Sequence, residues 1–314
     1  MRAALTKLRP NLARGGFTQR HASRSMSGAR AAPAFTFSDE QAKFYDDVLA
    51  RGVFQVWSEK LFEVSRPALG ESVLDVACGT GVVARACARE VGVEGSVTAM
   101  DNSSGMLERA RASGTGGAAA RVEFVEGDAC ERDHGERTFD RAYCQQGLQF
   151  MENPTRAMEL IRKALKPGGH FTAAVWTTAR ADSNQMMYHL GEALRDVGKE
   201  EWIPIALKPM SWCGSGAADG AGSTKLEDCL ISAGFINPDV SVEDGTFEFP
   251  SLDVAVDVAK VTPYGAELAG DAELWNAFSK SFRNRLAPFV NADGVVSVPA
   301  RSFIAHGVAP WNAP

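Results

Sequence analysis

The sequence predicts an α/β fold with a doubly wound, mostly parallel sheet, and two segments carry this prediction. Residues 73–81 read Val-Leu-Asp-Val-Ala-Cys-Gly-Thr-Gly, a short apolar run followed by a glycine turn. Residues 97–101 read Val-Thr-Ala-Met-Asp, about one strand–helix–strand unit later. Strands buried on both faces are apolar runs, and ligands bind where such parallel strands end. The two segments therefore predict a ligand site at the carboxyl edge of the sheet.

The glycine turn predicts the start of a helix that faces a ligand. Gly79 and Gly81 permit a sharp turn and let backbone N–H groups approach a ligand closely. Apolar residues then recur at helical spacing from 83 to 91, and Gly92 is placed to end the helix.

Asp75 bears on which ligand the turn binds. The spacing G-x-G-x-x-A over residues 79–84 fits the dinucleotide fingerprint, which leaves an NAD-dependent oxidoreductase open. A carboxylate four residues before the first glycine would repel a pyrophosphate. It favours a ligand with an amino group and a positive sulfur, and S-adenosylmethionine has both.

Five segments resemble, in order, the motifs of the class I S-adenosylmethionine-dependent methyltransferases. Residues 73–81 resemble the first motif, and Asp101 stands where that family has its ribose-binding acid. Residues 126–129 (Glu-Gly-Asp-Ala) resemble the adenine-binding turn, 139–144 the fourth strand, and 165–171 the turn into the fifth. Ordered motifs are more specific than one glycine loop. The resemblance implies a Rossmann-like, doubly wound, seven-stranded and mostly parallel sheet with helical cap insertions.

The resemblance also implies which residues hold the cofactor, S-adenosyl-L-methionine. Asp75 would help to hold its amino group, Asp101 its two ribose hydroxyls, and Asp128 its adenine amino group. The full expected set is Asp75, Ala77, Gly79, Gly81, Asp101, Asn102, Met106, Asp128, Ala129 and Gln145.

The acceptor side begins at Gln145, because strand ends of an open α/β sheet face the ligand crevice. We expect Gln145 to touch the cofactor or the reacting atom, and His189 is the second candidate catalytic residue. Methyl transfer from a sulfonium mainly needs alignment and exclusion of water, which agrees with the lack of a recognisable catalytic triad. No His, Asp or Glu cluster has metal-ligand spacing, so no catalytic metal is predicted.

Patterning divides the chain into a basic leader, residues 1–38, and a methyltransferase domain, residues 39–314. Within the domain, 67–176 is the predicted cofactor-binding core, and 181–222 and 251–291 are predicted substrate-cap insertions. A helix is expected over 39–66 with a break near Gly52. A capping box at 224–227 predicts a helix start. A strand over 240–249 is expected, with a possible bulge at 244–245.

The leader carries seven Lys and Arg and no acidic residue. This composition is typical of an organelle transit peptide, so we expect a disordered segment that directs the protein to the mitochondrion, with the plastid as the alternative. Without those seven cations the formal net charge goes from −6 to −13, which argues against a nucleic-acid partner. No apolar run approaches the ~20 residues of a membrane-spanning helix.

The predicted function is methyl transfer from S-adenosylmethionine, by in-line displacement, to a small-molecule acceptor. The motifs resemble stand-alone small-molecule members of the family, methyltransferase type 11 and relatives of the ubiquinone/menaquinone C-methyltransferases. A quinone-pathway C-methyltransferase is therefore one alternative. A non-catalytic, methyltransferase-like organelle assembly factor is another.

Overall fold

The computed structural model describes residues 43–114, 120–212 and 219–311, without the side chains of 219–222. The predicted leader, residues 1–38, lies outside them.

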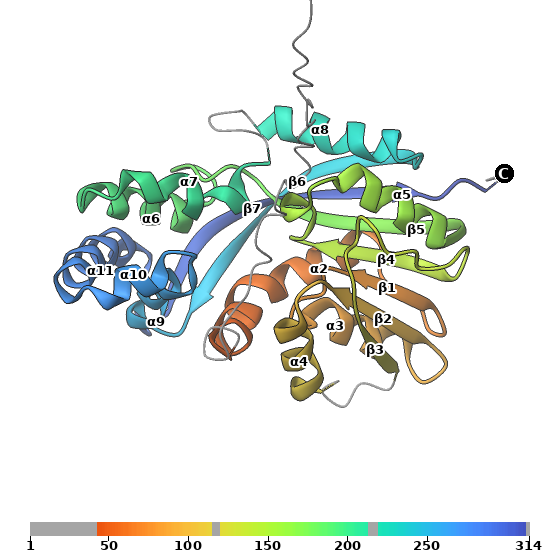
Figure 1. Ribbon diagram of the computed structural model, residues 1–314, viewed down its shortest axis with the longest axis horizontal. Helices are drawn as coiled ribbons and strands as arrows, with labels where there is room; N and C mark the ends of the chain where they lie inside the picture. Colours follow the sequence, from red (N-terminus) through yellow and green to blue (C-terminus); the bar gives the residue numbers. More distant parts are fainter. Residues whose placement is uncertain (1–42, 115–119, 213–218, 312–314) are drawn as a thin grey trace, which may run out of the picture. The chain divides into compact units, whose positions relative to one another are not determined.

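Seven strands form one sheet in the order β3-β2-β1-β4-β5-β7-β6 (Figure 1). Strands β1 to β5 pair in parallel, and β7 runs antiparallel to both of its neighbours, β5 and β6. This confirms the predicted seven-stranded, mostly parallel sheet. The strands are β1 (Ser72–Val76), β2 (Ser96–Asp101), β3 (Arg121–Glu126), β4 (Phe139–Gln145), β5 (Leu165–Trp176), β6 (Ile236–Phe249) and β7 (Val296–Val308).

Helices cover both faces of the sheet, and the chain enters it through an N-terminal helix of two parts, η1 (Tyr45–Phe54) and α2 (Gln55–Val64). The other α-helices are α3 (Val82–Val91), α4 (Ser104–Ser113), α5 (Pro154–Ala164), α6 (Gln185–Asp196), α7 (Ile203–Ala206), α8 (Asp219–Ser232), α9 (Leu252–Asp257), α10 (Gly265–Gly270) and α11 (Ala272–Leu286). Short 3₁₀ turns are η2 (Leu148–Phe150), η3 (Glu200–Trp202), η4 (Lys208–Met210), η5 (Val258–Val261) and η6 (Ala287–Phe289). In the described part of the chain, no helix is both long and apolar enough to cross a bilayer.

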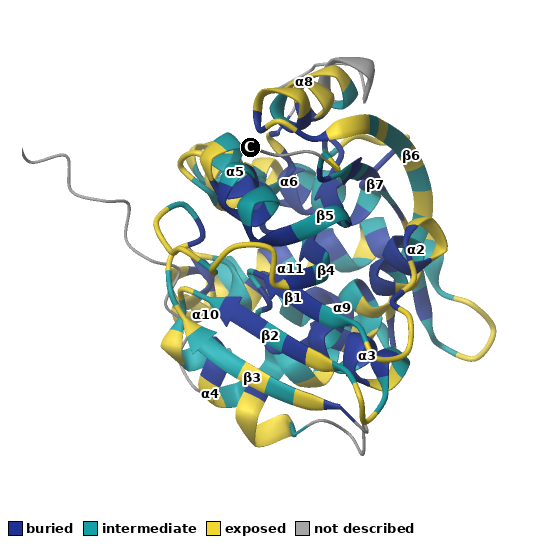
Figure 2. Cartoon of the chain, turned by 90° about the vertical axis from the view of Figure 1, so that its right-hand side faces the viewer, coloured by how far each residue is buried: buried dark blue, intermediate teal, exposed yellow. Residues whose placement is uncertain are grey.

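Strand alternation divides the core into two layers. Val73 belongs to the layer that α2 and α3 cover, whereas Leu74 and Val76 belong to the layer that α5 and α8 cover. Successive strand residues point to opposite faces, so the apolar run of β1 supplies both layers. Figure 2 shows the central strands buried and the edge strand β3 largely exposed.

The two predicted insertions pack against each other beside the sheet. Leu190 of α6 and Phe282 of α11 lie fully buried in one core. Trp202 and Tyr264, from the two different insertions, stack with ring centroids 5.0 Å apart. The segments form one helical body, while their role as a substrate cap stays a prediction.

Three details differ from the sequence prediction. The N-terminal helix continues through Gly52, because residues 45–54 take wide π-helical turns that join α2 directly. Thr224 lies inside α8 and does not begin it, so the capping box is wrong. Strand β6 keeps its register past Asp244 and Gly245, and its irregularity lies further back, between Ile236 and Asp239.

Gly52 is the point where η1 meets the edge strand β6. A Cβ atom at residue 52 would overlap the carbonyl oxygen of Glu248. We expect Gly52→Ala to lower the free energy of unfolding by about 1–3 kcal/mol, because overpacking forces the backbone to shift. Gly105→Ala is the matched control, since Gly105 lies in α4 with open space around it, and alanine should stabilise that helix by up to about 1 kcal/mol. Urea denaturation measures both; equal stabilities would contradict the close contact.

His170 and His306 form a stacked pair across β5 and β7, with Nδ1 of the first 3.0 Å from Nε2 of the second. Burial lowers the pKa of both rings and the charge of Arg141 adds to this, while Glu71 and Asp239 act in the opposite direction. The folded state therefore favours neutral rings, and the free energy of unfolding should fall as pH drops below about 6.5. Denaturation at pH 7.5 and at pH 5 measures this fall in the free energy of unfolding. The double variant His170→Gln/His306→Gln should show a smaller one; an unchanged pH dependence would exclude the pair as its source.

Candidate functional site

Four turns converge at the carboxyl edge of the sheet, one after each of the strands β1 to β4. The Cys78 N–H donates to the Met100 carbonyl oxygen at 2.9 Å, which joins the first turn to β2. The Gly127 N–H donates to the Asp101 carbonyl oxygen at 3.0 Å, which joins the third turn to β2. The sequence motifs that are separated along the chain thus meet at one edge.

The glycine turn is held by the carboxylate of Asp101. Gly79 and Gly81 have φ of 55° and 85°, the left-handed region that glycine adopts without penalty. The Gly79 N–H donates to Asp101 Oδ2 at 2.8 Å, and the Ser103 N–H donates to Oδ1 at 2.9 Å. A carboxylate has about four acceptor sites, so Asp101 can still accept from a ligand hydroxyl beside these backbone donors and the Asn102 N–H. Ala77 also has a positive φ, 58°, and such strained residues concentrate at ligand sites.

Asp75 is a buried carboxyl group without a good hydrogen-bond donor. It is 1% exposed, and among the described residues neither of its oxygens has a hydrogen-bond partner. Burial raises the pKa of this carboxyl to about 8, and the charge of Asp101 adds to this. The opposing effects are smaller: the Ala84 N–H is near but forms no well-aligned hydrogen bond, and the charge of Arg85 favours the carboxylate. A buried acceptor pair of this kind is satisfied best by a cationic ligand.

A small pocket of about 30 Å³ lies over β1 and the glycine turn. Its floor includes Asp75, Ala77 and Gly79, and its roof is made by the aromatic rings of Tyr45 and Phe54. Gln145 also lines it: Nε2 donates to the Phe54 carbonyl oxygen at 3.0 Å, and the buried Oε1 has no partner among the described residues. The predicted residues of the methionine end therefore share one pocket, apart from Gly81, which follows directly as the first turn of α3 begins.

The predicted ribose and adenine residues lie on the two adjacent turns. Asn102 is exposed after β2, and Met106 is buried in α4. Asp128 is exposed after β3 and its Oδ1 accepts from the Cys130 N–H at 2.7 Å, while Ala129 is buried. One oxygen of Asp128 is thus partly engaged, and the other remains available to a ligand donor.

Comparison with known proteins agrees with this arrangement. A family model described as "Methyltransferase domain" matches residues 73–169. This match, together with the relatives below, supports a class I S-adenosylmethionine-dependent methyltransferase. The match covers β1 through the first residues of β5, which is the part of the chain that forms the four turns.

Three relatives illustrate the extent of the likeness. This chain is 33% identical over 145 residues to a demethylmenaquinone methyltransferase of Clavibacter sepedonicus, across 45% of this chain and 56% of that protein, so it spans only about half the length of that relative. It is 26% identical over 181 residues to one of Listeria monocytogenes, across 57% of this chain and 76% of that protein. A structure of Haemonchus contortus phosphoethanolamine N-methyltransferase 2 with S-adenosyl-L-methionine has a TM-score of 0.55 at 19% identity, across 89% of this chain and 61% of that one. At that identity it shows the fold alone.

His189 is not brought to this pocket. Its ring lies on α6, with its centroid 5.7 Å from that of Phe289 and 5.2 Å from that of Tyr188. Its Nδ1 is buried without a partner among the described residues, and burial lowers the pKa of the ring. A catalytic role for His189 therefore stays a prediction, and among the two candidate catalytic residues only Gln145 lines the pocket.

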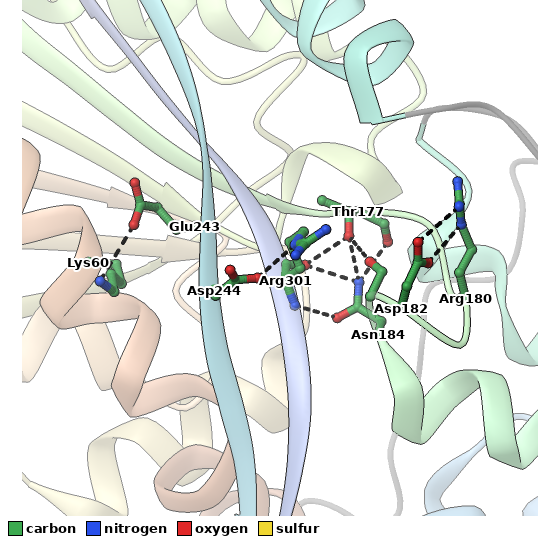
Figure 3. Close-up of polar contacts among 9 residues, drawn as sticks. Lys60, Thr177, Arg180, Asp182, Asn184, Glu243, Asp244 and Arg301 are labelled. Atoms are coloured by element: carbon green, nitrogen blue, oxygen red, sulfur yellow. Dashed lines mark hydrogen bonds and ion pairs between the residues drawn. The ribbon is translucent and has the colours of Figure 1, made fainter.

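Sequence reasoning missed a polar network that joins the first insertion to the sheet (Figure 3). The side-chain amide of Asn184 donates to the Thr177 carbonyl oxygen at 2.9 Å and to the Arg301 carbonyl oxygen at 3.0 Å. Its Oδ1 accepts from the Arg301 N–H at 3.0 Å. Asn184 is fully buried, and it fixes the start of α6 against β7. Partners 117 positions apart leave no local sequence signal.

Proposed function

We propose that the protein transfers the methyl group of S-adenosylmethionine to a small-molecule acceptor by in-line displacement. The observation that carries this proposal is the bond from the Gly79 N–H to Asp101, beside the buried, unpartnered carboxyl of Asp75. A cation, a pair of hydroxyls and a close backbone approach fit these three features. The match of residues 73–169 to a methyltransferase domain supports the same reading.

Each pocket residue has a task in this proposal. When bound, S-adenosylmethionine supplies a methyl group activated by a positively charged sulfur. Asp75 binds the ammonium group, and Asp101 accepts from the ribose hydroxyls while holding the glycine turn in place. Tyr45 and Phe54 exclude water from the reacting atoms, and Gln145 offers its free Oε1 to orient the acceptor.

Two measurements test this function. Calorimetry with purified protein should show binding of S-adenosylmethionine, and NADH should not compete. Incubation with labelled S-adenosylmethionine and a metabolite extract should then transfer label to a small molecule that mass spectrometry identifies. Binding without transfer would favour the non-catalytic alternative, and competition by NADH would favour an oxidoreductase.

A quinone-pathway acceptor is the second candidate. It is favoured by the names of the relatives in Clavibacter sepedonicus and Listeria monocytogenes, which are demethylmenaquinone methyltransferases. The half-buried ring of Phe54, which lines the pocket, would suit an apolar ring system. The test is methylation of a reduced demethylmenaquinone. Transfer to extract metabolites but not to this quinol would exclude it.

We also propose a mitochondrial location, which rests on the basic composition of residues 1–38. Fusion of these residues to a fluorescent protein should direct it to mitochondria. Substitution of the seven cations by glutamine should abolish that import, and plastid accumulation would support the alternative location.

A further inference from the structure

Gln146, the residue directly after Gln145 at the end of β4, has an unfavourable backbone conformation in a buried place. Its φ is 55°, in the left-handed region, where residues other than glycine are uncommon. It is 6% exposed, and its N–H donates to the Ala174 carbonyl oxygen of β5 at 2.8 Å. Strained residues of this kind persist only where the surrounding structure fixes them, and they concentrate at ligand sites. The contacts around Gln146 must therefore offset the cost of its conformation.

The side-chain amide of Gln146 is held at both ends. Its Nε2 donates to Ser302 Oγ at 2.8 Å, and its Oε1 accepts from Gln149 Nε2 at 3.4 Å. Ser302 is fully buried in β7, and its neighbours Ala300 and Ile304 belong to the layer that α2 and α3 cover. Residues two apart in a strand share a face, so Ser302 lies on that face as well. The bond crosses β5 and ties the end of β4 to a strand with which β4 does not pair.

The left-handed turn brings both glutamine side chains to one face of the sheet. In a continued strand, Gln146 would point to the face opposite Gln145. Gln145 follows Tyr143 by two positions, and Tyr143 belongs to the layer that α2 and α3 cover. Because Gln146 leaves the strand conformation, its amide reaches Ser302 on this same face. There the Gln145 Nε2 donates to the Phe54 carbonyl oxygen at 3.0 Å.

Gly147 brings this turn against the floor of the pocket. A Cβ atom at residue 147 would lie 2.6 Å from the Ala77 Cβ and 2.9 Å from the Cys144 Sγ, so only glycine allows the approach. Ala77 lines the pocket, and its φ of 58° is close to that of Gln146. Two strained residues thus follow the paired strands β1 and β4. The turn after β4 cannot shift without disturbing the floor of the pocket.

We propose that Gln146 is a positioning residue: its bond to Ser302 holds the turn that presents the free Oε1 of Gln145 to the methyl acceptor. This role rests on the proposed function, in which Gln145 orients the acceptor. Of the two glutamines, it is Gln145 that lines the pocket in the part of the chain that the structure describes. Gln146 acts through its neighbour, because a fixed turn limits the positions that the Gln145 side chain can take.

Replacement of Ser302 tests this role without changing either glutamine. Ser302→Ala removes the hydroxyl that Gln146 binds, whereas Ser302→Thr keeps it. Label transfer from S-adenosylmethionine to a metabolite extract should fall about tenfold or more in Ser302→Ala, since small misplacements of an orienting group are costly. Transfer should recover in Ser302→Thr, and the affinity for S-adenosylmethionine should stay unchanged in both. The control is Ser183→Ala, which removes another buried hydroxyl, 2.6 Å from Thr177 Oγ1, and should leave transfer unchanged.

A double-variant cycle separates positioning from a general loss of structure. If Ser302→Ala acts through Gln145, adding it to Gln145→Ala should cause no further loss of transfer. Losses that multiply in the double variant would overturn the positioning role. Gln146→Gly provides a second route to the same test, because glycine adopts the left-handed turn freely but has no amide. It should reduce transfer as much as Ser302→Ala does.

Hydrogen exchange of the Gln145 side-chain amide gives a readout that needs no acceptor. Nitrogen-15 NMR detects this amide, whose signal is identified by its loss in Gln145→Ala. Exchange should be clearly faster in Ser302→Ala and in Gln146→Gly than in the wild-type protein and in Ser183→Ala. Unchanged exchange would overturn the positioning role alone. Faster exchange in a protein whose wild-type form transfers no methyl group would instead overturn the proposed function, while the link from Ser302 to Gln145 would stand.

Discussion

Replacing Asp75 with asparagine is expected to stabilise the ligand-free protein and to weaken binding of S-adenosylmethionine. The carboxyl is 1% exposed and lacks a donor, so its charged form is unfavourable in the folded protein. The amide has nearly the same shape and carries no charge. At pH 7 we expect Asp75→Asn to raise the free energy of unfolding by about 2 kcal/mol or more.

The direction of this change in the free energy of unfolding follows from the ionisation of Asp75. Burial raises the pKa of Asp75 from 3.8 to about 8, so the unfolded chain releases the proton first. The stability that the protonated group contributes is complete below pH 3.8 and is lost as pH rises through about 8. Asp75→Asn should remove this loss. The same ionisation should make wild-type affinity for S-adenosylmethionine rise between pH 6 and 8, because a carboxylate attracts the ammonium group.

Denaturation and calorimetry across pH 5 to 9 measure both effects. Affinity at pH 8 should fall about 10- to 100-fold in Asp75→Asn, since a charge-assisted contact is worth about 1.5–3 kcal/mol. Asp133→Asn is the control, because Asp133 is exposed and pairs with Lys163 at 2.8 Å. A ligand-free Asp75→Asn protein less stable than wild type would contradict the account of this site.

Asp101→Ala should abolish most of the cofactor affinity. The carboxylate accepts from the Gly79 and Ser103 N–H groups, so the variant loses the ligand hydroxyls and the support of the glycine turn together. Loss of two contacts to a charged group predicts at least a 100-fold weaker affinity.

Calorimetric titration of S-adenosylmethionine measures this change. Asp101→Asn is the informative companion: its side-chain oxygen can still accept from Gly79, so the turn should persist while one acceptor is lost. We expect its affinity to lie between those of wild type and Asp101→Ala. An affinity within a factor of two of wild type in Asp101→Ala would show that the ribose site is elsewhere.

Short sequence patterns predicted the parts of the site that depend on residues close together in the chain. The glycine turn and Asp101 follow directly from strand ends and glycine spacing, because parallel strands bring their carboxyl ends to one edge. The helix over residues 82–91 and its end at Gly92 followed from apolar spacing, whereas the seven-stranded sheet was implied by the family resemblance. A prediction from local sequence failed at Thr224. Threonine is a common capping residue and was predicted to begin a helix, but Thr224 lies inside α8.

The roof of the pocket could not be predicted in the same way. Gln145 donates to the Phe54 carbonyl oxygen across 91 positions of sequence, and neither residue type signals such a bond. Gly52 looks like a helix breaker, yet it is required by the approach of Glu248 from β6. The distance of His189 from the pocket likewise depends on how α6 packs, which its own sequence does not specify.

The order of the elements along the chain has an evolutionary consequence. Every residue that lines the small pocket lies between Tyr45 and Gln145, whereas both helical insertions follow Trp176. The first insertion lies between β5 and β6 and the second between β6 and β7, so neither interrupts β1 to β4. Recombination or insertion downstream of residue 177 can therefore remodel the helical body in one lineage while the first half of the gene is inherited unchanged.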